Sequence, residues 1–336
     1  MKYIILILIL FILSCEQNVD PELPVFEQRA VVTSIIHPDS AITVFLTENI
    51  SVLSTKRPGS VTGSRIDLYE NDLFLGSLEE TTINPSEYES QYIDTLRGVY
   101  KMDYYPKAGS TYRMEADNEK YPDITAITEI PEQTSDFEVV ISDPQIIQIF
   151  DESESYESVI AEYVANITIK DSPGINYYAV SLLFKSTDID QYFNSAGEEI
   201  CELSSRIFEQ DFTSNSIIFE LGESSGFENE AGEVFNDDLF ENQNFEFQIT
   251  FRVWGSRSLA CGEMIYSDTF MIQLRSLSEE YYQYMATTTL QKAVLEDPFA
   301  EPVQIYSNIE GGLGVFGGYN FETFEFSMRE LLDDLD

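Results

Sequence analysis

The chain has 336 residues, and its 60 acidic against 18 basic side chains give a formal net charge of −42. So large an excess of negative charge argues against a nucleic-acid partner, because the phosphates would be repelled. Aromatic residues make up 13% of the sequence, which favours β-strands and argues against a disordered polymer.

The start of the chain has the pattern of a bacterial lipoprotein signal. Lys2 precedes an unbroken apolar run from Ile4 to Leu13, which is too short to span a bilayer as a resident helix. Ser14 is a small residue placed before Cys15, whose thiol can carry a diacylglycerol. The alternative is an ordinary secretory signal that happens to contain a cysteine. We therefore predict a signal peptide over residues 1–14 and lipid attachment at Cys15.

A polar tether over residues 15–24 leads into a first domain over residues 25–132. Its short apolar–polar alternating segments, separated by turn residues at regular spacing, predict an immunoglobulin-like or prealbumin-like β-sandwich. The expected strands are 26–34, 41–46, 64–70, 73–78, 98–105, 111–116 and 124–130. His37 lies in the turn after the first strand, and we interpret it as a surface residue rather than a general base.

Residues 132–160 are rich in acids, and we expect much of this stretch to be a solvated loop. The second domain, residues 133–336, is predicted to be β-rich and sandwich-like, with one helix over residues 278–295. Ser276 and Glu279 form a capping-box pattern at its start, and its aromatic stripe is expected to pack on a sheet. The expected strands are 162–169, 176–185, 216–221, 245–254, 268–274 and 320–327.

Cys201 and Cys261 remain as an even pair once Cys15 is assigned to the lipid. In an oxidising compartment they favour a disulfide, with two buried free thiols as the alternative and metal ligation as a poor third. The best calcium candidates are four carboxylates in one loop: Glu233, Asp237, Asp238 and Glu241. They lack the spacing that folds a loop around calcium, so we expect no metal site and no cofactor.

Gly312, Gly314 and Gly317 match a dinucleotide-binding glycine pattern. A dinucleotide site needs a following helix and a later acidic residue, and the chain leaves no room for that unit. We interpret residues 311–318 as a strand with close backbone packing, bounded by glycine turns. A Ser-His-Asp triad would have to use His37, and no carboxylate pair is marked for glycoside cleavage. We therefore assign no catalytic residue and expect no enzyme.

Several segments resemble, in order, domain-of-unknown-function family 4249 of Bacteroidota outer-membrane lipoproteins. These segments are residues 36–44, 61–69, 98–100, 109–112, 234–240, 277–282 and the run from 297 to 317. The resemblance implies an outer-membrane lipoprotein with an immunoglobulin-like first domain and a second β-rich domain. Such proteins often accompany TonB-dependent transporters, and the family supplies no catalytic residues. Glu16 is the single acid directly after Cys15, so both the periplasmic and the cell-surface leaflet stay open.

The expected function is that of a non-enzymatic binding or scaffold protein, joined to the membrane by the lipid on Cys15. Its expected partner is an outer-membrane β-barrel, either a TonB-dependent transporter or an assembly complex. The alternatives are a lipoprotein that binds a glycan or small ligand for a transporter and, third, a hydrolase. The sequence leaves the oligomeric state open.

Overall fold

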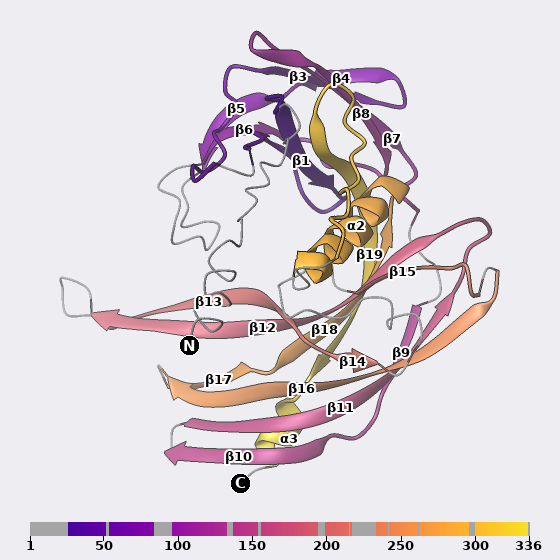
Figure 1. Ribbon diagram of the computed structural model, residues 1–336. Helices are drawn as coiled ribbons and strands as arrows, with labels where there is room; N and C mark the ends of the chain where they lie inside the picture. The colour runs from indigo at the N-terminus through magenta and orange to yellow at the C-terminus, as the bar shows by residue number, and fades with distance from the viewer. Residues whose placement is uncertain are drawn as a thin grey trace, which may run out of the picture.

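The computed structural model describes the chain from residue 26 to residue 334, with gaps (Figure 1). The described ranges are 26–51, 54–83, 96–132, 137–153, 156–193, 199–214, 216, 233–240, 242–260, 262–295 and 300–334. The fold is mainly β, with 62% of the described residues in strands and 8% in helices, which confirms the predicted fold class and its sandwich-like layout. The expected strand at 216–221 lies almost wholly outside the described residues.

The first half of the chain folds into two facing sheets whose strands alternate buried and exposed residues. One sheet contains β1 (Ala30–Ile36), β2 (Ile42–Glu48), β5 (Glu79–Ile83) and β6 (Leu96–Met102). The other contains β3 (Arg65–Glu70), β4 (Leu73–Ser77), β7 (Thr111–Asn118) and β8 (Tyr121–Glu129). Asn71 and Asp72 have positive φ angles of 48° and 64°, which suit the tight turn predicted between β3 and β4.

The first sheet is completed by a strand from the other end of the chain. The first part of β19 (Leu313–Ser327) pairs in parallel with β1, with Val31 opposite Leu313 and Ile36 opposite Gly318. Phe316 is fully buried in the first core. The sequence divided the chain at residue 132 and did not anticipate that residues 313–318 lie in the first sandwich.

The second half packs two further sets of strands against each other. One set contains β9 (Phe137–Ile141), β10 (Gln145–Ser153), β11 (Tyr156–Lys170), β14 (Thr213–Ser214), β16 (Asn244–Ala260) and β17 (Glu263–Ser267). The other contains β12 (Tyr177–Phe193), β13 (Glu199–Gln210), β15 (Glu233–Asn236), β18 (Thr269–Leu277) and the end of β19. Strands β9 and β10 correct the expectation of a solvated loop over residues 132–160.

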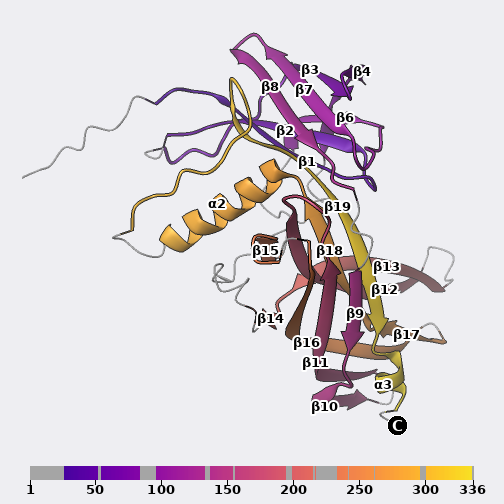
Figure 2. The same ribbon diagram turned by 90° about the vertical axis from the view of Figure 1, so that its right-hand side faces the viewer.

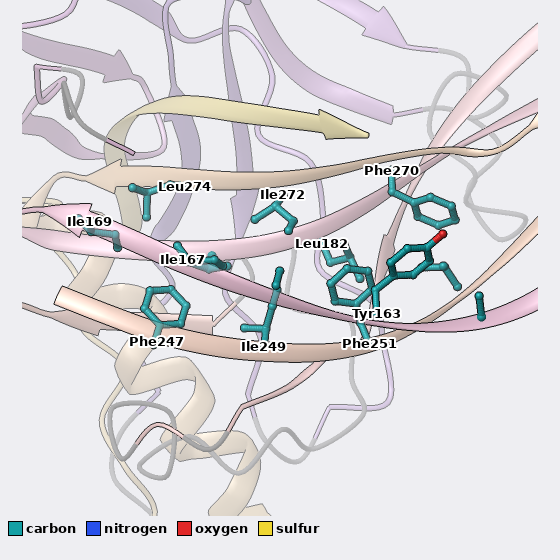
Figure 3. Packing of buried hydrophobic residues seen from close by; sticks show 14 of the residues in the cluster. Tyr163, Ile167, Ile169, Leu182, Phe247, Ile249, Phe251, Phe270, Ile272 and Leu274 are labelled. Atoms are coloured by element: carbon teal, nitrogen blue, oxygen red, sulfur yellow. The ribbon is translucent and has the colours of Figure 1, made fainter. Parts of the chain in front are cut away.

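Large apolar side chains from both sets of strands fill the second core (Figure 3). Ile249 of β16 and Ile272 of β18 are fully buried, as is Leu182 of β12. Each such side chain contributes about 1.5–3 kcal/mol through removal from water. The same β19 continues into this half, where its residues 319–327 pair with β18 in antiparallel. One long strand therefore belongs to both halves (Figure 2).

Helix α2 (Glu279–Leu295) confirms the predicted helix, and a short helix α3 (Arg329–Asp333) follows β19. The predicted capping residue is displaced by two positions. Ser276 is still part of β18, and Ser278 is the residue whose Oγ accepts a hydrogen bond from the Tyr281 backbone N–H at 3.2 Å. Tyr281 and Met285 are buried against β19 and β12, as expected for a helix packed on a sheet.

Candidate functional site

Of the three cysteines, Cys201 alone lies in the described part of the chain. It is on β13, opposite Gln191 of β12. Cys15 and Cys261 fall outside the described residues. Lipid attachment at Cys15 and the disulfide between Cys201 and Cys261 therefore stay predictions.

The acidic loop that holds the calcium candidates is partly described. Glu241 lies outside the described residues. Burial, assisted by the charge of Glu209, raises the pKa of Glu233 above its usual value. Asp238 accepts a hydrogen bond from Asn236 Nδ2 at 2.9 Å. In the part of the chain that the structure describes, no three Asp, Glu, His or Cys side chains converge to hold a metal ion.

Asp237 is the buried member of this loop and belongs to a hydrogen-bond network. Its Oδ2 accepts from the backbone N–H of Asn176 at 2.9 Å and from Asn176 Nδ2 at 3.0 Å. A second buried carboxylate, Asp171, accepts from the Tyr178 hydroxyl at 2.7 Å and from the Asn242 backbone N–H at 2.7 Å. Asn176 Nδ2 also reaches Asp171 Oδ1 at 3.3 Å. These bonds join the acidic loop to the turn before β12.

The two buried acids are used to hold the fold together at this point. Burial raises the pKa of Asp237, while the two hydrogen bonds from Asn176 oppose that rise. No local sequence pattern indicated that Asp171 would meet Asp237. Pairing of carboxylates that are 66 positions apart depends on the sheet and not on local spacing.

A polar cleft of about 450 Å³ lies where the two halves meet. Its walls come from the end of β8 and the segment after it, the turn before β12 with the start of that strand, and the end of β18 with the first turn of α2. The lining side chains include four carboxylates and one aromatic ring, namely Glu129, Glu132, Glu279, Glu280 and Tyr177. The volume lies in the range of small-molecule sites. The sequence could not reveal this cleft, because its walls are far apart along the chain.

The aromatic ring of the cleft is engaged within the protein. Tyr177 stacks on Tyr282 of α2, with ring centroids 4.6 Å apart and planes 24° apart. The cleft therefore does not offer the pair of exposed coplanar rings that would indicate a sugar-binding platform. Its chemistry is that of carboxylate oxygens at the N-terminus of a helix.

His37 is half-buried rather than fully exposed, which modifies the expectation of a surface residue. Its ring stacks on Tyr319 of β19 at 4.8 Å and meets the edge of Phe321 at 6.0 Å. Burial lowers its pKa below the usual value, Asp39 opposes that effect, and Arg275 adds to it. His37 thus packs the turn between β1 and β2 against the part of β19 that lies in the second half.

The glycine-rich segment forms a strand with close backbone packing, as predicted, and opens no helix. Gly314 has a φ of +101°, and a Cβ there would collide with the carbonyl oxygen of Val32 on β1. A Cβ at Gly318 would lie 2.5 Å from the Glu129 carbonyl oxygen. Asn308 fastens the segment by donating to the Phe316 carbonyl at 2.7 Å and accepting from its N–H at 3.0 Å.

A model of the family described as a domain of unknown function (DUF4249) matches residues 16–325. The chain belongs to this family. No match to a curated protein was found.

The segments that carried the DUF4249 resemblance have structural roles in this chain. Residues 234–240 contain Asp237 and its network, and residues 311–317 contain the glycines that let β19 approach β1. Among the described residues, no helix is long and apolar enough to cross a membrane.

Proposed function

We propose that this DUF4249 protein is an outer-membrane lipoprotein, attached through a lipid on Cys15, that works as a non-enzymatic binding or scaffold component. Its partner is an outer-membrane β-barrel, either a TonB-dependent transporter or an assembly complex. The observation that carries the proposal is the opening sequence, in which the apolar run Ile4 to Leu13 is followed by Ser14 and Cys15.

Three further observations favour a binding role over a catalytic one. The buried acids Asp171 and Asp237 are engaged in hydrogen bonds that join a loop to the turn before β12. His37 is packed on aromatic rings, and we infer no general-base role for it. The body is a pair of β-sandwich halves linked by one strand, a form that presents sheet edges and end loops for docking.

Attachment is tested by replacing the proposed lipid site. Cys15→Ala removes the thiol and should move the protein from the membrane fraction to the soluble fraction, because acyl chains are the proposed anchor. Ser14→Ala is the matched control, since it keeps a small residue at the cleavage position. Retention of the Cys15→Ala protein in the membrane fraction would refute the lipid anchor.

Partnership is tested with the native, lipidated protein. We expect an outer-membrane β-barrel to co-purify from mild detergent at stoichiometric yield, as identified by mass spectrometry. If the protein purifies without any outer-membrane β-barrel, the scaffold role is refuted.

The cleft between the halves supports a second candidate function, the binding of a small hydroxyl-rich or cationic ligand. Carboxylates such as Glu129 and Glu280 can accept hydrogen bonds from hydroxyl or ammonium groups. A thermal-shift screen of glycans and amines tests it, with Glu129→Gln as the variant that should abolish a stabilising hit. If no compound raises the melting temperature, the ligand-binding function is refuted and the scaffold role is the one that remains.

A further inference from the structure

The second half of the molecule has one sheet edge formed jointly by β9 and β10. Strand β16 pairs with β11 over residues 156–170. The opposite side of β11 is shared, with β10 pairing along residues 156–162 and β9 along residues 165–169. Within the described ranges, no strand pairs with the outer side of β9 or β10.

This edge exposes large apolar side chains. Val140 of β9 is 65% exposed, and Ile146, Ile147 and Ile149 of β10 are 45%, 45% and 51% exposed. Isolated exposed apolar residues are ordinary, but three of these four, Ile146, Ile147 and Ile149, lie within one short stretch of β10 and form an apolar row beside which a further strand could pair. Such an edge presents backbone N–H and C=O groups to an added chain.

The apolar row also lacks the charges that normally protect an edge strand. Residues 144–150 contain no charged side chain, in a chain where 23% of residues are charged. The edge strand β13 is different, because Leu203 and Ile207 alternate with Glu202, Arg206 and Glu209. A β-bulge near Ile146 gives β10 some protection, but the ladder is regular from Gln148 to Asp151. β10 therefore carries fewer protective charges than β13.

The charges at the ends of the row indicate what could cover it. Asp143 precedes the neutral stretch, and Asp151 and Glu152 follow it. A second copy of the chain, paired antiparallel about Ile147, would place Asp143 opposite Asp151, and opposed like charges destabilise strand pairs. A strand with an apolar centre and basic ends would instead meet an acid at each end.

We propose that the β9–β10 edge captures an extended segment of a partner protein as an added β-strand. That segment has alternating apolar side chains and Lys or Arg at both ends. Backbone hydrogen bonds to β10 supply the attachment, and the acidic residues that flank the neutral stretch 144–150 in the sequence favour basic ends on the added strand. The inference rests on the proposed binding function and names the means by which the partner is held.

A synthetic strand tests the chemistry directly. The probe is a peptide of about twelve residues that alternates Thr and Val and carries Lys at both ends. We expect it to slow hydrogen exchange of the β10 backbone amides in the full-length protein. The same peptide with Glu at both ends should bind at least about tenfold more weakly, since the end charges now repel. No protection of β10, or equal protection by both peptides, would overturn the proposal.

Charge placed in the apolar row provides the matched variants. Ile147→Lys with Ile149→Lys should abolish protection by the Lys-ended peptide, because the added charges repel its ends and interrupt its apolar contacts. Leu73→Lys is the control, since Leu73 is 72% exposed on β4 and lies in the other half. Both variants should keep the wild-type circular dichroism spectrum. Equal peptide binding by both variants would count against the proposal. A dimer in analytical ultracentrifugation, with the β10 amides protected in the absence of peptide, would also count against it.

The native partner separates this inference from the proposed function. A photo-crosslinking residue at Gln148 of the lipidated protein should form an adduct with an apolar segment flanked by basic residues, mapped by mass spectrometry. If a barrel co-purifies equally with wild type and the double Lys variant, the edge proposal fails and the scaffold role stands. If the Lys-ended peptide binds but no barrel co-purifies, strand capture stands and the barrel partnership fails.

Discussion

His37 shows how a single residue can make the stability of this acidic protein depend on pH. In the folded chain, burial on Tyr319 lowers its pKa below the usual value of 6.5. The unfolded chain therefore binds a proton first as the pH falls. Its contribution to stability is complete above pH 6.5 and is lost as the pH falls from 6.5 through the lowered folded-state pKa. Asp39 and Arg275 are the charged groups that act on it.

We predict that His37→Phe reduces the pH dependence of unfolding. The aromatic contact with Tyr319 is kept, whereas the titrating group is lost. The free energy of unfolding from urea titrations should fall less steeply for the variant than for wild type between about pH 7.5 and about pH 5. Parallel curves for the two proteins would show that His37 does not titrate as proposed.

Gly314 is the residue at which β19 depends most on the absence of a side chain. We predict that Gly314→Ala lowers the free energy of unfolding by more than about 2 kcal/mol, because strain at positive φ is added to a collision with Val32. Gly174→Ala is the control, with a similar φ of +106° but no atom within 4 Å of the new Cβ. It should cost only about 1 kcal/mol in the same denaturation measurement. Equal costs would mean that the contact with Val32 is unimportant.

At the residue scale, the sequence predicted that the glycines allow close backbone packing, but it did not predict which residues they contact. A glycine run without room for a helix was enough to predict a closely packed strand. The contact with Val32 depends on a pairing between residues about 280 positions apart, and no local pattern encodes it. The stacking of His37 on Tyr319 was missed for the same reason.

Helix α2 begins at the junction of the two halves, and its cap holds both. Ser278 Oγ accepts from the backbone N–H groups of Tyr281 and Gly318, each at 3.2 Å. Thr128 Oγ1 of β8 lies 3.1 Å from both Ser278 Oγ and Glu280 Oε2. The start of the helix is thereby bound to the first sandwich and to β19 at once.

We predict that Ser278→Ala lowers the free energy of unfolding by about 1–2 kcal/mol, since it removes a helix cap and leaves buried N–H groups without a partner. Ser276→Ala, at the position expected from the capping-box pattern, should cost less than about 0.5 kcal/mol. Thermal unfolding followed by circular dichroism distinguishes them. A larger effect at Ser276 would favour the sequence pattern over the observed cap.

At the element scale, strands with regular apolar–polar alternation could be predicted from the sequence, whereas a strand whose alternation is interrupted could not. The predicted helix over residues 278–295 agrees with α2 because its aromatic stripe is a local signal, although the capping-box pattern pointed to Ser276 and the cap is Ser278. Strand β10 was missed because its bulge near Ile146 interrupts the period of two. The acids on either side of it then gave the stretch the composition of a loop.

The whole molecule is joined by β19, so the first sandwich should not be an independent folding unit. We predict that residues 25–132 expressed alone give a poorly dispersed amide NMR spectrum, because β1 lacks its parallel neighbour and Phe316 is missing from the core. Fusing residues 305–318 through a flexible linker should restore dispersion. A well-folded fragment without that addition would contradict the prediction.

At the scale of the whole molecule, the sandwich class could be predicted and the connection between the halves could not. Turn spacing and alternation are enough to indicate two β-rich regions. The sharing of one strand depends on the parallel register of β1 with β19, which alternation along either strand does not specify. The cleft between the halves exists because both halves share β19, and it could not be predicted from the sequence for the same reason.

The shared strand also sets an order of events in folding. Val31 needs Leu313 as its neighbour, so the first sheet cannot close until almost the whole chain has been made. Closing so long a loop slows folding, because its entropy must be lost before the contacts form. A chain of this design stays open while it is being synthesised, and an open chain can be threaded through a translocation channel. For the lipoprotein that we propose, the position of one strand thus leaves time for export before the chain becomes compact.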